Sequence, residues 1–162
     1  MKIGVISDTH LAGGDETLKT ALAAPFHDVD WIVHAGDLVD LAVLDLFKPK
    51  TVRAVHGNCD SGRIRDLLPS RLILDVGGFR LAVVHDAGYP VRVPTGRDHP
   101  GGPVDCLVFG HTHRPVNRVT DGILYFNPGS AAHNRCSPTA TVGILEIGAG
   151  IRGEIIELRK KR

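Results

Sequence analysis

The sequence predicts an α/β protein in which two β-sheets pack together and helices lie outside them. Three observations support this fold class. Short apolar runs bounded by Gly, Asp, Pro or Asn recur along the chain; patterns of helical period separate the first three of these runs; and from residue 116 onward only strand patterns follow. With 43% hydrophobic and 23% charged residues, the chain can bury a core of its own, so we expect one domain over residues 1–162.

The first third of the chain alternates strands with helices. We expect strands at residues 2–7, 31–34 and 51–55, because each is a short apolar run that ends at a turn-forming residue. Residues 16–24 and 38–47 lie between them and have the apolar spacing of helices. This β-α-β-α-β order predicts that one sheet begins with parallel strands.

The later part of the chain has the character of hairpins. Further strands are expected at residues 71–76, 81–85, 106–109, 116–119, 123–126, 139–147 and 151–158. The sequence VGGF at residues 76–79 is typical of a hairpin turn. Residues 88–103 are rich in Pro and Gly without an apolar period, so we expect a long loop there, either a lid that faces substrate or a connection without a role.

Composition excludes several classes of function. Nineteen Lys and Arg against eighteen Asp and Glu give a formal charge of +1, which is too small a field to bind long nucleic acid. The three cysteines form no CxxC pair, so a reduced, cytoplasmic setting is expected. No apolar stretch is long enough to cross a bilayer, and the amino terminus leads directly into a strand without the pattern of a secretion signal.

Side chains of the metal-binding types follow five of the predicted strands, at the point where each strand ends. They are Asp8, His10, Asp37, Asn58, His85, His111 and His113. Because ligands of α/β sheets bind beyond the carboxyl ends of the strands, we expect these side chains to meet in one place. Carboxylate, imidazole and amide groups without thiolate suit Mn, Fe, Co, Ni or Zn. A pair of such divalent ions would leave the site positively charged, and a phosphate group is the expected ligand.

These motifs resemble those of the calcineurin-like metallophosphoesterase superfamily. The resemblance rests on DTH at residues 8–10, GD at 36–37, GNCD at 57–60, His85 and GHTH at 110–113. NPGS at residues 127–130 is similar to the small single-domain phosphodiesterases of bacteria and archaea. The resemblance implies a four-layer α-β-β-α sandwich of two mixed β-sheets flanked by helices. It also implies hydrolysis of a small phosphoester, with a phosphodiester expected first, by a hydroxide that bridges two divalent metal ions.

The resemblance also implies a role for each matching residue. Asp8, His10 and His113 would bind one metal ion, Asn58, His85 and His111 would bind the other, and Asp37 would bridge the two. Manganese is the first candidate for both ions. Asp37, Asn58, Cys59 and His85 are the residues expected to take part in catalysis.

The chain departs from the family pattern at two positions. Cys59 stands where many relatives carry His, which would act as an acid towards the leaving oxygen; Cys59 is therefore either a weaker acid-base group or simply a small buried residue. We hypothesise that activity favours phosphodiesters or activated leaving groups. Asp86 and Ala87 follow His85 where the phosphodiesterase branch has HGH, and candidates to replace the missing His lie in the long loop, namely Arg92, Arg97 and His99.

Some alternatives remain open at the level of sequence. His34 and His56 could orient the metal ligands through hydrogen bonds or could simply be packed in the core. A nuclease of the same superfamily and a non-catalytic, protein-binding scaffold of the same fold are the rival functions. A scaffold has no need of an intact ligand set, and this chain retains all seven residues. A homo-oligomer, either a dimer or a tetramer, would be compatible with so small a chain.

Overall fold

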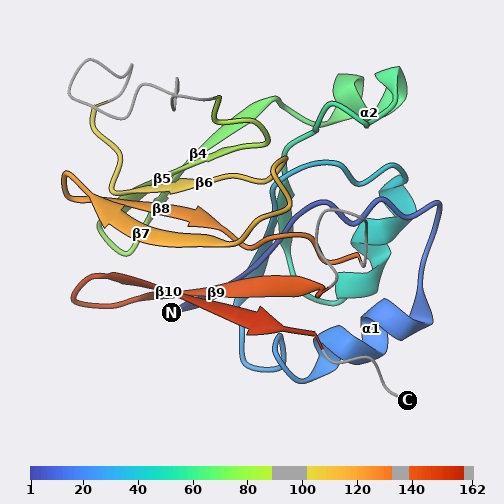
Figure 1. Ribbon diagram of the computed structural model, residues 1–162, viewed down its shortest axis with the longest axis horizontal. Coiled ribbons are helices and arrows are strands. Elements are labelled where there is room, and N and C mark those ends of the chain that lie inside the picture. Colours follow the sequence, from blue (N-terminus) through green and yellow to red (C-terminus); the bar gives the residue numbers. More distant parts are fainter. Residues whose placement is uncertain (89–101, 133–138, 159–162) are drawn as a thin grey trace.

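Two mixed β-sheets of five strands each lie at the centre of the molecule (Figure 1). The computed structural model describes residues 1–88, 102–132 and 139–158. The loop residues Arg92, Arg97 and His99 lie outside the described residues, as does most of the long loop expected at residues 88–103. The α/β class and the two mixed sheets predicted from the sequence are confirmed.

The first sheet has the strand order β10-β9-β1-β2-β3. Its strands are β1 (Lys2–Ile6), β2 (Trp31–His34), β3 (Val52–Ala54), β9 (Thr141–Ile147) and β10 (Ile151–Glu157). β1 pairs in parallel with β2, and β2 with β3, which confirms the parallel start. β9 pairs antiparallel with both β1 and β10. The three parallel strands therefore end at the same edge of this sheet.

The second sheet has the strand order β4-β5-β6-β8-β7. Its strands are β4 (Arg71–Val76), β5 (Phe79–Val84), β6 (Cys106–Val108), β7 (Val116–Thr120) and β8 (Ile123–Asn127). β4 and β5 form the expected hairpin, in which Gly77 and Gly78 adopt φ angles of 59° and 86°. Positive φ at both central residues is the geometry of the tight turns that suit a twisted hairpin, and it favours glycine.

The largest apolar cluster lies between the two sheets and draws on β1, β2, β5, β6, β8 and β9. Phe126 is fully buried there. Its ring packs directly against the backbone of Gly143 and Gly153, and a Cβ on either residue would collide with the ring. A second cluster packs α1 (Glu16–Ala23) and the 3-10 helix η1 (Leu41–Phe47) against the first sheet. The sheets are thus held together by close packing, and the loops at their ends are left to carry the polar residues.

The helices differ from expectation in two places. A helix was expected over residues 38–47, but Asp37 and Val39 have φ angles of 56° and 75°, so the helical turn starts only after Asp40, whose side chain accepts a hydrogen bond from the Ala42 N–H. The helix α2 (Gly62–Leu67) was not predicted, because six residues are too few to show an apolar period. In the part of the chain that the structure describes, no helix has the length and apolar character needed to span a membrane.

Candidate metal centre

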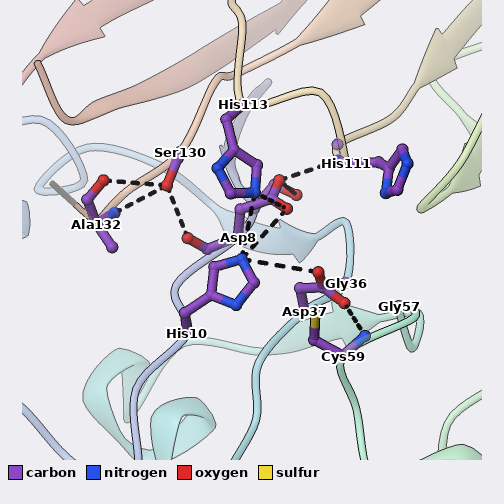
Figure 2. A network of polar contacts seen from close by, with 12 residues as sticks. Asp8, His10, Gly36, Asp37, Gly57, Cys59, His111, His113, Ser130 and Ala132 are labelled. Atoms are coloured by element: carbon purple, nitrogen blue, oxygen red, sulfur yellow. Dashed lines mark hydrogen bonds and ion pairs between the residues drawn. The ribbon is translucent and has the colours of Figure 1, made fainter. Parts of the chain in front are cut away.

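The seven predicted ligands lie together in the loops that follow β1, β2, β3, β5 and β6. Three of them form one half of the cluster, as Figure 2 shows. The Nε2 atoms of His10 and His113 are 3.2 Å apart. Asp8 Oδ1 lies 3.0 Å from His113 Nε2 and 3.8 Å from His10 Nε2. His10 and His113 are therefore neighbours in space although they are 103 residues apart in the chain.

The other half of the cluster gathers around Asn58. Its Oδ1 lies 3.0 Å from His85 Nε2 and 2.9 Å from His111 Nδ1. Asp37 connects the two halves, since its Oδ2 lies 3.3 Å from His85 Nε2 and 3.7 Å from His10 Nε2. The convergence predicted from the strand ends is therefore observed, and Asp37 occupies the middle of it.

The backbone of the cluster is unusual. Five of the seven residues adopt positive φ angles between 48° and 67°, namely Asp8, His10, Asp37, His111 and His113. Residues other than glycine seldom adopt this conformation, which costs on the order of 1–3 kcal/mol each and concentrates at functional sites. The surrounding packing must therefore hold these loops in place.

Two glycines let the loops approach one another closely. A Cβ on Gly57 would collide with Asp37 Oδ1, and a Cβ on Gly110 would collide with Ser7 Oγ. This explains why glycine precedes Asn58 and His111 in the motifs, where the backbone must pass directly against a neighbouring loop.

Asp60, the last residue of the GNCD motif, holds two of the loops together. Its buried carboxylate accepts hydrogen bonds from the backbone N–H groups of Asp37 at 3.1 Å, Gly57 at 2.7 Å and Val39 at 2.7 Å. No role was assigned to Asp60 from the sequence. Its place directly after Asn58 and Cys59 was the only available signal, because the three donors that it binds become apparent only in the fold.

The NPGS motif braces the loops on the opposite side. Ser130 Oγ donates a hydrogen bond to the backbone carbonyl of Asp8 at 2.8 Å, as Figure 2 shows, and Asn127 Nδ2 donates to the carbonyl of Gly110 at 2.8 Å. Ser7 Oγ donates to Asp8 Oδ2 at 2.6 Å. The motif thus positions the loop of Asp8 and the loop that carries His111 and His113.

His34 combines both of the readings left open by the sequence. It is fully buried, and burial lowers its pKa to about 4, so the ring is neutral. Its Nδ1 accepts a hydrogen bond from the Gly36 N–H at 3.2 Å, and its Nε2 lies 3.2 Å from Thr9 Oγ1. His34 therefore links the Asp8 and Asp37 loops. His56 is only half-buried, and its Nδ1 lies 3.4 Å from the carbonyl of Gly57.

Cys59 is exposed, so its reading as a small buried residue is wrong. Its backbone N–H donates to Asp37 Oδ1 at 2.7 Å, and its Sγ lies within 4.8 Å of ligand atoms of His10 and Asp37. Partial desolvation and the neighbouring Asp37 carboxylate raise the pKa of the Cys59 thiol to about 11. The thiol is therefore protonated at neutral pH and is a weak acid.

The charges of the cluster suit a cation. Asp37 is partly desolvated, which acts to raise its pKa, but hydrogen bonds from His85 and the Cys59 N–H outweigh this effect and hold the pKa well below its usual range. Asp8 Oδ1 is buried and has no partner in hydrogen-bond geometry, despite its short distance to His113. A buried carboxylate oxygen in this state needs a compensating positive charge.

Three overlapping groups have ligand atoms within 4.8 Å of one another: Asp8–His10–His113, His10–Asp37–Cys59 and Asp8–Asp37–His85. Imidazole and carboxylate groups at such spacing are suitable ligands for divalent transition metals. The residues present therefore fit the metal ions expected from the sequence.

Comparisons with known proteins agree with this geometry. Residues 1–150 match the model of the calcineurin-like phosphoesterase superfamily domain. A probable metallophosphoesterase of Methanocaldococcus jannaschii is 35% identical, over 99% of this chain and 83% of its own length. The solved structure of an archaeal phosphodiesterase superposes with a TM-score of 0.79 at 25% identity, covering 98% of this chain and all of the other. Vps29 from Entamoeba histolytica, at 20% identity and a TM-score of 0.69 over 98% of this chain and 100% of its own, shares the fold. The chain belongs to the calcineurin-like phosphoesterase superfamily.

Proposed function

We propose that this protein is a phosphodiesterase that hydrolyses a small phosphoester with the help of two divalent metal ions. The observation that carries the proposal is the place of Asp37. Its carboxylate lies between His10 on one side, at 3.7 Å, and His85 on the other, at 3.3 Å. A single carboxylate between two groups of imidazoles is the arrangement that a bridged pair of cations needs.

The two halves of the cluster supply the ligands in this proposal. Asp8, His10 and His113 would hold one ion, Asn58, His85 and His111 the second, and Asp37 both. Two divalent ions bound here would lower the pKa of water and polarise the phosphoryl oxygens of the substrate. Manganese is the first candidate, and Fe, Co, Ni and Zn suit the same ligands.

The side chains on the open side of the cluster determine which esters can react. Asn58 is exposed, and among the described residues its Nδ2 donates only to the sulfur of Cys59, at 3.4 Å, so this amide can donate to a phosphoryl oxygen instead. The Cys59 thiol, with its pKa of about 11, is a poor proton donor to a leaving oxygen. This favours phosphodiesters and activated leaving groups over ordinary phosphomonoesters.

The proposal is tested by substituting the bridging carboxylate. Asp37→Asn is expected to lower kcat/KM for bis(p-nitrophenyl) phosphate by at least about 1000-fold, because both ions lose their shared anionic ligand. Elemental analysis of protein purified without chelator is expected to give close to two divalent ions per wild-type chain and fewer in the variant. Asp45→Asn, which alters an exposed carboxylate paired with Lys48, serves as the control.

Two results would overturn the proposal: an Asp37→Asn variant that keeps wild-type turnover, or a wild-type protein that binds no divalent ion and hydrolyses no phosphoester in the presence of any of the five metals. Single-stranded DNA belongs in the substrate panel, since preferential cleavage of long strands would favour a nuclease instead.

A further inference from the structure

A groove with a volume of about 480 Å³ opens beside the Asn58 half of the cluster. Three cluster residues line it, namely Asn58, His85 and His111. Four further charged or polar side chains line it, namely Arg65, Ser70, Arg71 and Asp86. The volume is within the range of sites that bind small molecules, and the groove is continuous with the place proposed for the scissile phosphate.

Arg65 forms a fixed wall of this groove. It lies on α2, and its Nη2 donates a hydrogen bond of 2.6 Å to the backbone carbonyl of Asn58. The guanidinium is therefore held next to a residue of the cluster, and it retains further N–H groups that can donate to a ligand.

Arg71 has no such tether. It is the first residue of β4 and pairs with Val84, the residue directly before His85, so the strand register places it next to the cluster. Arg71 is exposed, and its guanidinium makes neither a hydrogen bond nor an ion pair with the residues that the structure describes. An arginine beside a polar groove with all five donors available is suited to bind an anion.

The charge of the groove favours an anion as well. Two arginines and one carboxylate, that of Asp86, line the groove, and Asp86 Oδ1 already accepts a hydrogen bond from the Gly88 N–H at 2.7 Å. The planar guanidinium group matches the geometry of phosphate through paired hydrogen bonds.

We infer that this groove binds a second phosphate group, so that the substrate is a small phosphodiester that carries a further phosphate on one of its substituents. Arg71 is the residue that selects for it. The inference rests on the proposed function, because that function assigns the scissile phosphate to the metal centre. Arg71 would also provide phosphate contacts of the kind for which Arg92, Arg97 and His99 were the candidates from the sequence.

The test uses four esters that all release p-nitrophenolate and differ only in the second substituent on phosphorus: ethyl, choline, carboxymethyl and phosphoethyl. We expect kcat/KM to be lowest for the choline ester and to rise through ethyl and carboxymethyl to phosphoethyl. Arg71→Ala is expected to reduce kcat/KM for the phosphoethyl ester about 10-fold to 100-fold and to leave the ethyl ester unchanged, since only a charge-assisted hydrogen bond is lost. Arg71→Lys should retain part of the preference.

Arg118→Ala is the matched control, because Arg118 is an exposed arginine on β7, at the other edge of the same sheet. A carboxymethyl ester that reacts as fast as the phosphoethyl ester would show that the groove selects for any anion rather than for phosphate. Equal rates for all four esters, or an Arg71→Ala variant that slows all of them alike, would overturn the inference while the proposed function stands. Failure to hydrolyse even the ethyl ester would instead contradict the proposed function.

Binding gives a readout that does not depend on turnover. Calorimetry on the metal-loaded protein is expected to show ethylene bisphosphonate binding more tightly than ethylphosphonate. Arg71→Ala should lower the ratio of the two affinities about 10-fold. Chelation of free metal by the bisphosphonate is the same for both proteins and cancels in the comparison. Equal affinities of wild type and Arg71→Ala for the bisphosphonate would overturn the inference.

Discussion

The two halves of the candidate centre differ in how they are held. In the first half, Asp8 is fully buried and is fixed by hydrogen bonds from Ser7 and Ser130, while His10 and His113 are half-buried. Around Asn58 the side chains of Asn58 and His111 are exposed and border the groove, and Cys59 is exposed as well. The Asp8 half is thus the more buried of the two, and the Asn58 half is the more open. Arg65 and Arg71 line the groove beside the open half.

The largest expected effect comes from cutting the connection between the two halves. The Asp60 carboxylate accepts three backbone hydrogen bonds. Asp60→Asn keeps the size of the side chain but replaces one accepting oxygen with an NH₂ group, which cannot accept a hydrogen bond from a backbone N–H. We expect the free energy of unfolding to fall by about 3–5 kcal/mol, because buried charge-assisted bonds are lost. Urea unfolding measures this. The exposed carboxylate of Asp66 provides the control Asp66→Asn, and equal losses for both variants would refute the role of Asp60.

Acid should affect the buried half. The pKa of His34 is lowered to about 4 in the folded protein, against 6.5 for an unperturbed histidine, so protons bind preferentially to the unfolded state. The stability that neutral His34 contributes is complete above pH 6.5 and is lost as the pH falls from about 6.5 to 4, by on the order of 3 kcal/mol.

This pH dependence is checked by urea unfolding across that range for wild type, His34→Gln and the exposed-histidine control His27→Gln. The His34 variant should show a smaller slope than the other two proteins. A slope unchanged from wild type would show that His34 does not carry the effect.

The smallest effect is expected in the open half. Cys59→Ala should leave the free energy of unfolding within about 0.5 kcal/mol of wild type, because the side chain is exposed. Turnover of bis(p-nitrophenyl) phosphate should change less than about 3-fold, since a thiol with a pKa of about 11 contributes little as an acid. Cys59→His, by contrast, should raise turnover of p-nitrophenyl phosphate. If Cys59→Ala abolished turnover of the diester, the thiol would have a larger role than its pKa indicates.

Local patterns were sufficient for most strands and for the gathering of the ligands. Trp31–His34 and Arg71–Val76 have the predicted bounds, because short apolar runs and flanking turn residues are visible in a single stretch of sequence. The start of η1 was not predictable in this way, since the positive φ of Val39 depends on the Asp60 carboxylate, 21 residues further along the chain. Contacts of that kind are set by the fold and leave no periodic signal.

The same limit applies to the groove. Arg71 appears in the sequence only as the first residue of a strand, and its position beside His85 follows from the register of β4 against β5. The ligands were found because they repeat one pattern at several strand ends. Asp60 and Arg71 belong to no repeated pattern, and without the fold a single acidic or basic residue cannot be distinguished from an ordinary surface residue.

The pairing of two ions about Asp37 is tested most directly by anomalous X-ray diffraction from crystals grown with manganese. We predict two manganese peaks about 3.5–4 Å apart, one on each side of the Asp37 carboxylate, the first beside Asp8 and the second beside Asn58. A single peak, or peaks remote from Asp37, would contradict the account.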